Sequence, residues 1–326
     1  MATHEDWLSR LLALVPVRGR LDIYCTYGAP WRIDQASAAV GEMAYHALVA
    51  GSAVLEDPTG GPPLRLSAGD ILLLPRREDH VLRDGSGAQA GPSHTRAAAN
   101  LLISENEGPG ERLDMLCGHF VLARPQERLL RDYLPPRLVV RTGETAATAT
   151  SSGTRDVLNG LVSLMRHEAV SDGLGGRAML DALSTALFTL TLRLASEARE
   201  RPVGLLALAG HSRLAPALSA MFNEPGRQWT LPKLARLCGM SRATMARQFQ
   251  EKFGQSASEL LTDVRMTLAA NDLRKPSAST GAVAETVGYQ SEAAFQRAFK
   301  QRMGITPAQW RRGMQSAELS VPSLPS

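Results

Sequence analysis

Two segments in the last third of the chain share one pattern of hydrophobic and polar positions. In each, a short apolar run at helical spacing ends at a glycine, Gly239 or Gly288, and a serine follows within three residues. A serine at that position caps the start of a helix, because its hydroxyl accepts from a free backbone N–H. The pattern therefore predicts helix, tight turn and helix twice, over residues 231–254 and 282–304.

The second helix of each segment has an apolar stripe and an opposite polar face. The stripe residues recur at every fourth position, as one buried face requires: Met245, Phe249 and Phe253, then Phe295, Phe299 and Met303. The candidate contact residues on the opposite faces are Ser241, Arg242, Ala243, Thr244 and Arg247, then Ser291, Glu292, Ala293, Gln296, Arg297 and Lys300. Any amphipathic helix has a solvated charged face, but two capped copies favour a surface that contacts phosphates and base edges.

Further residues of this region complete a family pattern: Ala235, Gly254, Arg265, Ala284, Tyr289, Gly304, Thr306, Pro307 and Arg311. With the two capped helices, they resemble the DNA-binding domain of AraC/XylS-type bacterial transcription regulators, over roughly the last third of the chain. The resemblance implies two helix-turn-helix units separated by a long helix at 257–271. Recognition helices about 34 Å apart then enter successive major grooves on one face of the duplex.

The resemblance also implies roles for the contact residues. Those expected to meet base edges are Arg247, Glu292, Gln296 and Arg297. Those expected to hold phosphates are Ser241, Arg242, Ser291 and Lys300. Ala243 stands where relatives often have a long base-reading side chain, so Arg247 is the main guanine reader of the first helix. The second unit is therefore expected to carry more of the specificity.

The first third of the chain alternates short apolar runs with turns. After an amphipathic helix predicted at 5–15, which Pro16 ends, such runs continue over 21–122 between clusters of Gly, Pro and Asp. Closely spaced strands of this kind predict a small antiparallel barrel or sandwich. The turn at 67–70, the strand after it and His80 resemble the second conserved motif of cupins. The expected fold class is therefore α+β, with a cupin-like antiparallel β-barrel, a helical segment and a C-terminal all-α double helix-turn-helix domain.

Helices are predicted between these two parts. A stretch rich in Pro, Arg, Thr and Ala at 125–153 is typical of a connector, and helices with apolar stripes follow at 154–169 and 178–200. These helices either cover the barrel or pair two protomers, and both can hold; in the resembled family such helices commonly pair protomers. The expected domains are a cupin-like sensor at 1–124, a connector and dimerisation segment at 125–221, a DNA-binding domain at 222–316 and a disordered tail at 317–326.

Charge is distributed unevenly along the chain. The formal net charge is +4, but residues 222–316 hold 14 Lys and Arg against seven Asp and Glu, whereas residues 1–221 hold 22 against 24. A basic domain joined to a nearly neutral one fits phosphate contact by one end only. No apolar run approaches the ~20 residues of a membrane span, and the N-terminus lacks the basic start and apolar core of a secretory signal. The expected location is the cytoplasm.

Three cysteines are too few, and odd in number, for a structural disulfide framework. Cys238, beside a turn glycine, is typical of core filling. Strand alternation places Cys117 and His119 on the same side, where a protonated imidazole would lower the thiol pKa. From spacing alone, Cys25 and Cys117 are favoured as small buried residues.

A second resemblance changes this interpretation of the two cysteines. The segments concerned are 21–25, 46–48, 57–60, 69–75 with His80, and 117–118. Together they are similar to the cupin-fronted, reactive-chlorine-sensing branch of the AraC family. The similarity implies that Cys25 and Cys117 respond to an oxidant, one thiolate becoming a sulfenic acid that the other captures as a disulfide. Such closure requires Cα atoms within about 7 Å or a domain that can move.

The combined prediction is a cytoplasmic transcription regulator and not an enzyme, with promoter DNA, a second copy of the chain and RNA polymerase as partners, and with no cofactor and no membrane. One alternative is that the barrel senses a small molecule, or a metal held by His46, His80 and His119. A cupin metalloenzyme is disfavoured, because the paired histidines of the cupin motif and any acid/base constellation are missing. An RNA binder is disfavoured because stacking aromatics are missing.

Overall fold

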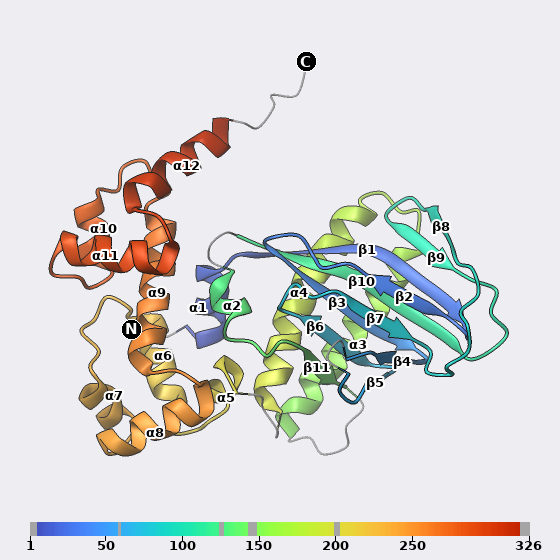
Figure 1. The fold of residues 1–326 in the computed structure, drawn as a ribbon, viewed down its shortest axis with the longest axis horizontal. Helices are drawn as coiled ribbons and strands as arrows, with labels where there is room; N and C mark the ends of the chain where they lie inside the picture. The colour runs from blue at the N-terminus through green and yellow to red at the C-terminus, as the bar shows by residue number, and fades with distance from the viewer. Residues whose placement is uncertain (1–4, 58–59, 124–126, 143–148, 199–202, 320–326) are drawn as a thin grey trace. The chain divides into compact units, whose positions relative to one another are not determined.

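The chain divides into two compact units (Figure 1). The computed structural model describes residues 5–57, 60–123, 127–142, 149–198 and 203–319. The sheet unit comprises Val17–Ala123 and Leu134–Pro202, and the helical unit comprises Met1–Pro16, Arg124–Tyr133 and Val203–Ser326. This spatial division differs from the ranges expected from the sequence, because the N-terminal helix belongs to the unit that contains the C-terminal helices.

The sheet unit contains two β-sheets. The seven-stranded sheet has the order β11-β6-β3-β10-β1-β9-β8, and the four-stranded sheet has the order β2-β7-β4-β5. The strands are β1 (Val17–Gly28), β2 (Arg32–Gln35), β3 (Glu42–Ala50), β4 (Ser52–Leu55), β5 (Leu64–Ser67), β6 (Asp70–Leu74), β7 (His80–Arg83), β8 (His94–Ala97), β9 (Leu102–Glu105), β10 (Arg112–Leu122) and β11 (Leu138–Arg141). Neighbouring strands are antiparallel, except that β1 and β9 are parallel. The expected α+β fold class is confirmed, and the strands of this unit form two sheets.

Both sheets contribute to one buried core. It contains Cys25, Tyr27, Leu48, Leu72, Leu74, Leu113, Met115 and Cys117 from the seven-stranded sheet, and Ala53, Leu55, Leu66 and Leu82 from the four-stranded sheet. Because side chains alternate along a strand, β10 presents the odd-numbered residues of this set to the core. Phe120, on its other face, packs against Phe188 with ring centroids 4.8 Å apart.

Two helices, α3 (Ala149–Ala169) and α4 (Gly176–Glu197), belong to this unit. Helix α4 packs on β1, where Gly19 N–H donates to Thr185 Oγ1 at 2.8 Å. Its Ser184 hydroxyl also lies 3.0 Å from the hydroxyl of Tyr45 on β3. Helix α4 is the single described helix with the length and apolar character of a membrane span. Its packing against the sheet accounts for that character, as expected of a helix that covers the sheet.

The stretch expected to be a connector contains ordered elements. Leu138 and Val140 are buried in β11, which pairs with β6 at the sheet edge. The short helix α2 (Arg128–Arg131) precedes it and belongs to the helical unit. The alternation of Leu138 and Val140 is the strand signal in this stretch, but four residues are too short to stand out beside two prolines.

The helical unit consists of α1 (Trp7–Leu14), α2, α5 (Leu205–Ala209), α6 (Ala215–Asn223), α7 (Leu231–Leu237), α8 (Arg242–Phe253), α9 (Ala257–Asp272), α10 (Thr280–Thr286), α11 (Glu292–Met303) and α12 (Pro307–Leu319). Helix α9 begins with a capping box of Ser256 and Glu259. Helix α1 buries Leu8, Leu11 and Leu14 and packs against α6 and α9. The tail expected from residue 317 is helical to 319, and residues 320–326 lie outside the described residues.

Candidate functional site

Each helix-turn-helix unit turns at a glycine in the left-handed region of backbone conformation. Gly239 has φ +60° between α7 and α8, and Gly288 has φ +82° between α10 and α11. A Cβ on Gly288 would lie 2.2 Å from the carbonyl oxygen of Gly226. Glycine is therefore required at Gly288 both for its conformation and for close contact with the preceding loop.

Helices α8 and α11 are equivalent, with an offset of 50 residues at both ends. The hydroxyl of Ser241 accepts from Thr244 N–H at 3.2 Å, and that of Ser291 accepts from Ala294 N–H at 3.4 Å. Over the ten residues that begin at each serine, the order of buried, half-buried and exposed positions is identical. The two helices therefore expose the same face, as the repeated sequence pattern predicts.

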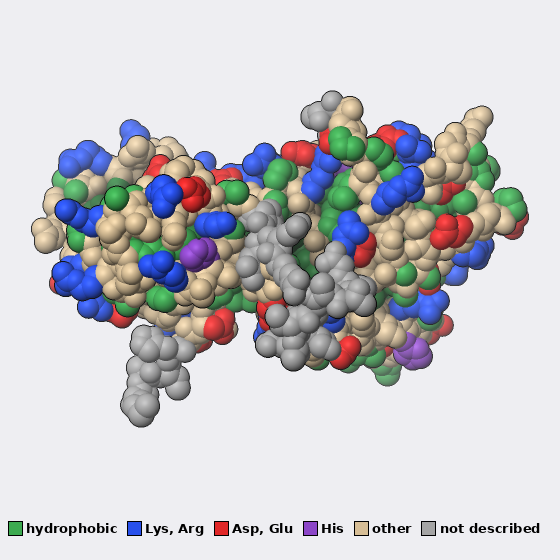
Figure 2. Space-filling view, turned by 90° about the horizontal axis from the view of Figure 1, so that it is seen from below, with side chains coloured by type: hydrophobic (Ala, Val, Ile, Leu, Met, Phe, Trp, Pro, Cys, Tyr) green, Lys and Arg blue, Asp and Glu red, His purple; other side chains and the backbone are tan. Residues whose placement is uncertain are grey.

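The exposed faces carry basic side chains without partners. Arg242, Arg247, Arg297 and Lys300 are exposed, and within the described part of the chain no carboxylate forms an ion pair with them. Figure 2 shows Lys and Arg side chains over the surface of the helical unit. Unpaired cations on exposed helices are suited to phosphate and guanine contacts.

The remaining contact residues are partly engaged within their own helices. Gln296 Nε2 donates to Glu292 Oε1 at 2.9 Å across one turn of α11. The Ser241 hydroxyl also lies 2.9 Å from Thr244 Oγ1, whereas the Ser291 hydroxyl accepts the cap bond and keeps its O–H able to donate to a phosphate. Ala243 and Ala293 are exposed and offer only methyl groups.

Residues outside the two helix-turn-helix segments hold the recognition helices in place. Asp263 of α9 pairs with Arg302 of α11 at 3.2 Å and accepts a hydrogen bond from the Tyr133 hydroxyl. Tyr133 also packs on Phe253 of α8, with ring centroids 4.6 Å apart. Tyr133 lies directly after α2, far in sequence from the recognition helices. Its contacts with Phe253 and Asp263 nevertheless connect α8 to α9, and Asp263 connects α9 to α11. Sequence reasoning did not identify this contact.

Cys25 of β1 and Cys117 of β10 lie side by side in the core of the sheet unit. Their sulfur atoms are 3.9 Å apart, both thiols are free, and the residues are only 3% and 6% exposed. In the strand register Cys25 is opposite Met115 and Cys117 is opposite Ile23, so the two cysteines are diagonal neighbours. Cys238, in the helical unit, is buried and free, in keeping with a core-filling residue.

The histidine that contacts Cys117 is His46, directly opposite it on β3. Its Nδ1 lies 3.1 Å from the Cys117 sulfur, and its Nε2 lies 2.8 Å from Nε2 of His80 on β7. His119, which strand alternation suggested as the partner of Cys117, instead pairs with Asp22 at 2.5 Å and Glu42 at 3.4 Å. The sequence suggested the wrong histidine, because a cross-strand neighbour lies closer than a residue two positions along the same strand.

The surroundings shift the pKa values of the two thiols in opposite directions and lower those of the two histidines. The hydrogen bond from Cys117 lowers the pKa of the Cys25 thiol, against the effect of burial, whereas the bond to Cys25 and burial raise the pKa of Cys117. Burial lowers the pKa of His46 to about 3, so this ring is neutral. Burial also lowers the pKa of His80, although the Glu78 carbonyl acts in the opposite direction. Negative charge in the cluster is thus favoured on Cys25.

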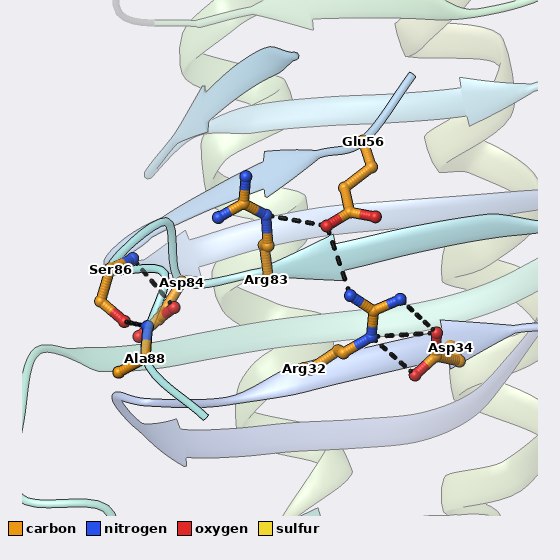
Figure 3. A network of polar contacts seen from close by, with 7 residues as sticks. All are labelled: Arg32, Asp34, Glu56, Arg83, Asp84, Ser86 and Ala88. Atoms are coloured by element: carbon orange, nitrogen blue, oxygen red, sulfur yellow. Dashed lines mark hydrogen bonds and ion pairs between the residues drawn. The ribbon is translucent and has the colours of Figure 1, made fainter. Parts of the chain in front are cut away.

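His80 also lines a surface pocket of about 470 Å³, together with Asp34, Gln35, Ala36, Glu56, Asp57, Asp79 and Val81. Figure 3 shows how Glu56 bridges Arg32 and Arg83 at the pocket wall, with distances of 3.3 and 2.9 Å. The two arginines are opposite each other on β2 and β7. The shared carboxylate offsets the repulsion that two like charges in that position would cause.

The cluster does not have the arrangement of a metal site. Among the residues that the structure describes, no group of three or more His, Cys, Asp or Glu side chains is arranged to hold a metal ion. His46 and His80 face each other through Nε2, and His119 has other partners. The three histidines suggested as metal ligands are therefore not brought together.

The fold and its paired recognition helices define a class of protein. It is a transcription regulator with an N-terminal cupin domain and a double helix-turn-helix domain. The cupin family profile matches residues 6–197, and a helix-turn-helix domain profile matches residues 234–313. The chain belongs to the AraC/XylS-type transcription regulators that have a cupin domain. The expected family is thereby confirmed.

The chain is similar over nearly its whole length to two regulators. It is 30% identical to an uncharacterized HTH-type transcriptional regulator of Haemophilus influenzae, over 95% of this chain and 99% of the relative. It is 29% identical to the RCS-specific HTH-type transcriptional activator RclR of Escherichia coli, over 94% of this chain and 97% of the relative. Among solved structures, the DNA-binding domain of AdpA in complex with a target DNA has 26% identity over 33% of this chain and 97% of that domain, with a TM-score of 0.31.

Proposed function

We propose that this regulator acts in the cytoplasm and responds to a two-electron oxidant such as hypochlorous acid, with Cys25 and Cys117 as the sensing pair. The observation that carries the proposal is the 3.9 Å separation of two free thiols on neighbouring strands. The similarity to an RCS-specific activator supports it. The helical unit would supply the DNA contacts, and the sheet unit the sensor.

The chemistry needs only the two thiols and the oxidant. The Cys25 thiolate attacks hypochlorous acid, forming a sulfenic acid and releasing chloride. The Cys117 sulfur then attacks the sulfenic sulfur, so that the S–S bond forms and water leaves. The two sulfurs together lose two electrons, which reduce the chlorine to chloride. The Cys117 thiol proton leaves in the water, and the one proton released overall is the one that Cys25 loses when its thiolate forms.

Disulfide closure would move the strands that carry the cysteines. The sulfur separation must fall from 3.9 Å to about 2.05 Å, and diagonal neighbours have Cα atoms farther apart than directly opposed ones. Two residues separate α1 from β1, and five separate β10 from α2. Because α1 and α2 belong to the helical unit, both cysteine-bearing strands are joined by short stretches of chain to the DNA-contacting part.

On DNA, α8 and α11 would each enter a major groove. Arg247, Arg297, Gln296 and Glu292 are proposed at base edges, which requires the Glu292–Gln296 pair to open or to contact a base as a unit. The phosphate contacts are proposed for Ser241, Arg242, Ser291 and Lys300. RNA polymerase is the proposed further partner at the promoter.

A second copy of the chain is proposed to pack against α3. Val157 and Leu164 lie on one face of this helix, seven residues apart, and are 58% and 47% exposed. Exposed aliphatic side chains at helical spacing form the seam of paired helices. A symmetric dimer would suit repeated DNA half-sites.

The decisive test uses the purified full-length chain, reduced and then exposed to hypochlorous acid in stoichiometric amount. Peptide mapping should show one disulfide between Cys25 and Cys117, and affinity for promoter DNA should change on oxidation. Cys25→Ser with Cys117→Ser should abolish both changes, whereas Cys238→Ser, the matched control, should abolish neither. A double variant that still responds to the oxidant would refute the sensing pair and would favour a ligand in the sheet unit.

A further inference from the structure

We propose that Cys25, Cys117, His46 and His80 form a proton relay, through which the thiol proton of Cys25 leaves the closed core at the pocket beside His80. The inference rests on the proposed sensing role of the cysteine pair and deepens it, because it names the groups that activate the pair. His46 and His80 act here as positioning and proton-transferring residues. Neither reacts with the oxidant.

The direction of each hydrogen bond follows from the last acceptor of the chain. His80 Nδ1 lies 3.3 Å from the carbonyl oxygen of Glu78, which can only accept, so Nδ1 carries the proton. In the neutral ring His80 Nε2 is then bare, and His46 Nε2–H donates to it at 2.8 Å. This leaves His46 Nδ1 bare to accept from the Cys117 thiol at 3.1 Å. Cys25 donates in turn to Cys117.

All these bonds run in one direction, so a concerted shift can carry a proton along the chain. The Cys25 proton moves to the Cys117 sulfur, the Cys117 proton moves to His46 Nδ1, and the His46 Nε2 proton moves to His80 Nε2. The result is a thiolate at Cys25 and an imidazolium at His80, with no other bond changed. Cys117 then donates to the thiolate, which is the arrangement that lowers the pKa of Cys25.

The relay solves a problem that burial creates for a sensing thiol. A thiolate is the reactive form of cysteine, but an apolar core disfavours its charge, and Cys25 is only 3% exposed. His46 is buried and is not itself one of the described residues that line the surface pocket. Burial keeps its pKa low, so it passes a proton on to His80 and does not keep it. His80 is the member of the chain that lines the pocket.

Burial disfavours a positive charge on His80, but the Glu78 carbonyl and a neighbouring carboxylate offset part of that cost. The charged residues that line the pocket with His80 are Asp34, Glu56, Asp57 and Asp79, and Arg137 pairs with Asp57 at 3.5 Å. Asp34 and Glu56 are already partnered by arginines. Asp79, next to His80 in sequence, accepts only from the backbone N–H of Ser37 among the contacts of the described chain, at 2.7 Å. It stabilises the imidazolium, whereas Arg137 opposes it.

The test measures the pH profile of Cys25 alkylation by iodoacetamide in the reduced full-length protein, with peptide mass spectrometry to separate the cysteines. His46→Gln and His80→Gln keep a hydrogen-bonding side chain but cannot pass a proton. Each should raise the pH midpoint and slow alkylation at neutral pH by about tenfold for each unit of midpoint shift. His119→Gln is the matched control, because His119 pairs with Asp22 and not with either thiol, and it should leave the profile unchanged.

The outcomes separate the relay from the sensing pair. Unchanged profiles in both histidine variants overturn the relay, while a Cys25–Cys117 disulfide in the wild type preserves the sensing role. If the wild type forms no disulfide, the sensing role fails, and the alkylation profile still decides whether the relay exists. Circular dichroism checks folding; if His46→Gln does not fold, His80→Gln, at the surface end, decides the result.

Discussion

Helix α1, at the opposite end of the chain from the recognition helices, should control the stability of the DNA-contacting unit. Leu11 of α1 is fully buried, and α1 packs against α6 and α9. Asn271 Nδ2 of α9 also donates to the carbonyl oxygen of Leu14 at 2.9 Å. Truncating a buried leucine to alanine removes its transfer free energy and leaves a cavity, which costs about 3 to 5 kcal/mol. Leu11→Ala should therefore lower the stability of the helical unit by that amount.

Hydrogen exchange followed by mass spectrometry locates the effect. Since 1.4 kcal/mol corresponds to a factor of ten, opening of peptides from α8, α9 and α11 should increase by about a hundredfold or more. Peptides from β3 and β10 should change little. Arg10→Ala is the matched control on the same helix, because Arg10 is partly exposed. Its ion pair with Glu5 is worth at most about 1 kcal/mol and its hydrogen bond to Asn223 about 1 kcal/mol, less than a buried leucine side chain. Faster exchange confined to the sheet unit would refute the assignment of α1 to the helical unit.

Three further predictions concern DNA contact, pH and assembly. Arg297→Ala should weaken binding to the specific DNA site by about 1 to 3 kcal/mol and relax the preference at one base position. Lys300→Ala should weaken binding to all DNA sequences alike and reduce the slope of log affinity against log salt concentration by about one. Equal losses of affinity on specific and random DNA for Arg297→Ala would contradict its role. Burial lowers the pKa of His46 to about 3, so the unfolded chain, where the ring titrates near 6.5, binds more protons at acid pH. Stability should therefore fall as pH falls below about 6.5, on the order of 1 kcal/mol per pH unit, and denaturation of His46→Gln should show a weaker dependence; an unchanged slope would count against a neutral His46. If the chain forms the proposed dimer through α3, Leu164→Glu should shift it to monomer in sedimentation, whereas Asn159→Glu, on another side of α3, should not. A dimer that persists in Leu164→Glu would exclude α3 as the interface.

The repeated helices were predictable from sequence because their signals are local. Serine caps, turn glycines and apolar residues at every fourth position all act within one or two helical turns, and α8 and α11 follow them to the residue. The helix at 257–271 was predicted to within one residue for the same reason, since Ser256 and Glu259 form a capping box.

The cysteine cluster was predictable only in part, because its geometry depends on strand pairing. Cys25 and Cys117 are 92 residues apart, and only the pairing of β1 with β10 brings them together. The pairing of β3 with β10 places His46 at Cys117, and the packing of two sheets adds His80. No periodicity within one strand carries this information, so strand alternation alone suggested His119.

The composition of the helical unit was also not visible in the sequence. Tyr133 lies in a stretch whose prolines and polar residues are typical of a connector, but it contacts Phe253 and Asp263. Helix α1 has an ordinary amphipathic pattern, which predicts a helix and not the surface that it covers. Tertiary packing sets these contacts between distant parts of the chain, so local sequence patterns did not predict where Tyr133 or α1 would pack.

Control of DNA occupancy by the thiols is tested most directly by mapping genomic binding sites in cells with and without a brief hypochlorite exposure, in wild type and in the Cys25→Ser variant. Discrete sites next to promoters should be found in both strains, and occupancy should change after exposure only in the wild type. An occupancy pattern that changes equally in both strains, or that shows no discrete sites in either, would contradict the account.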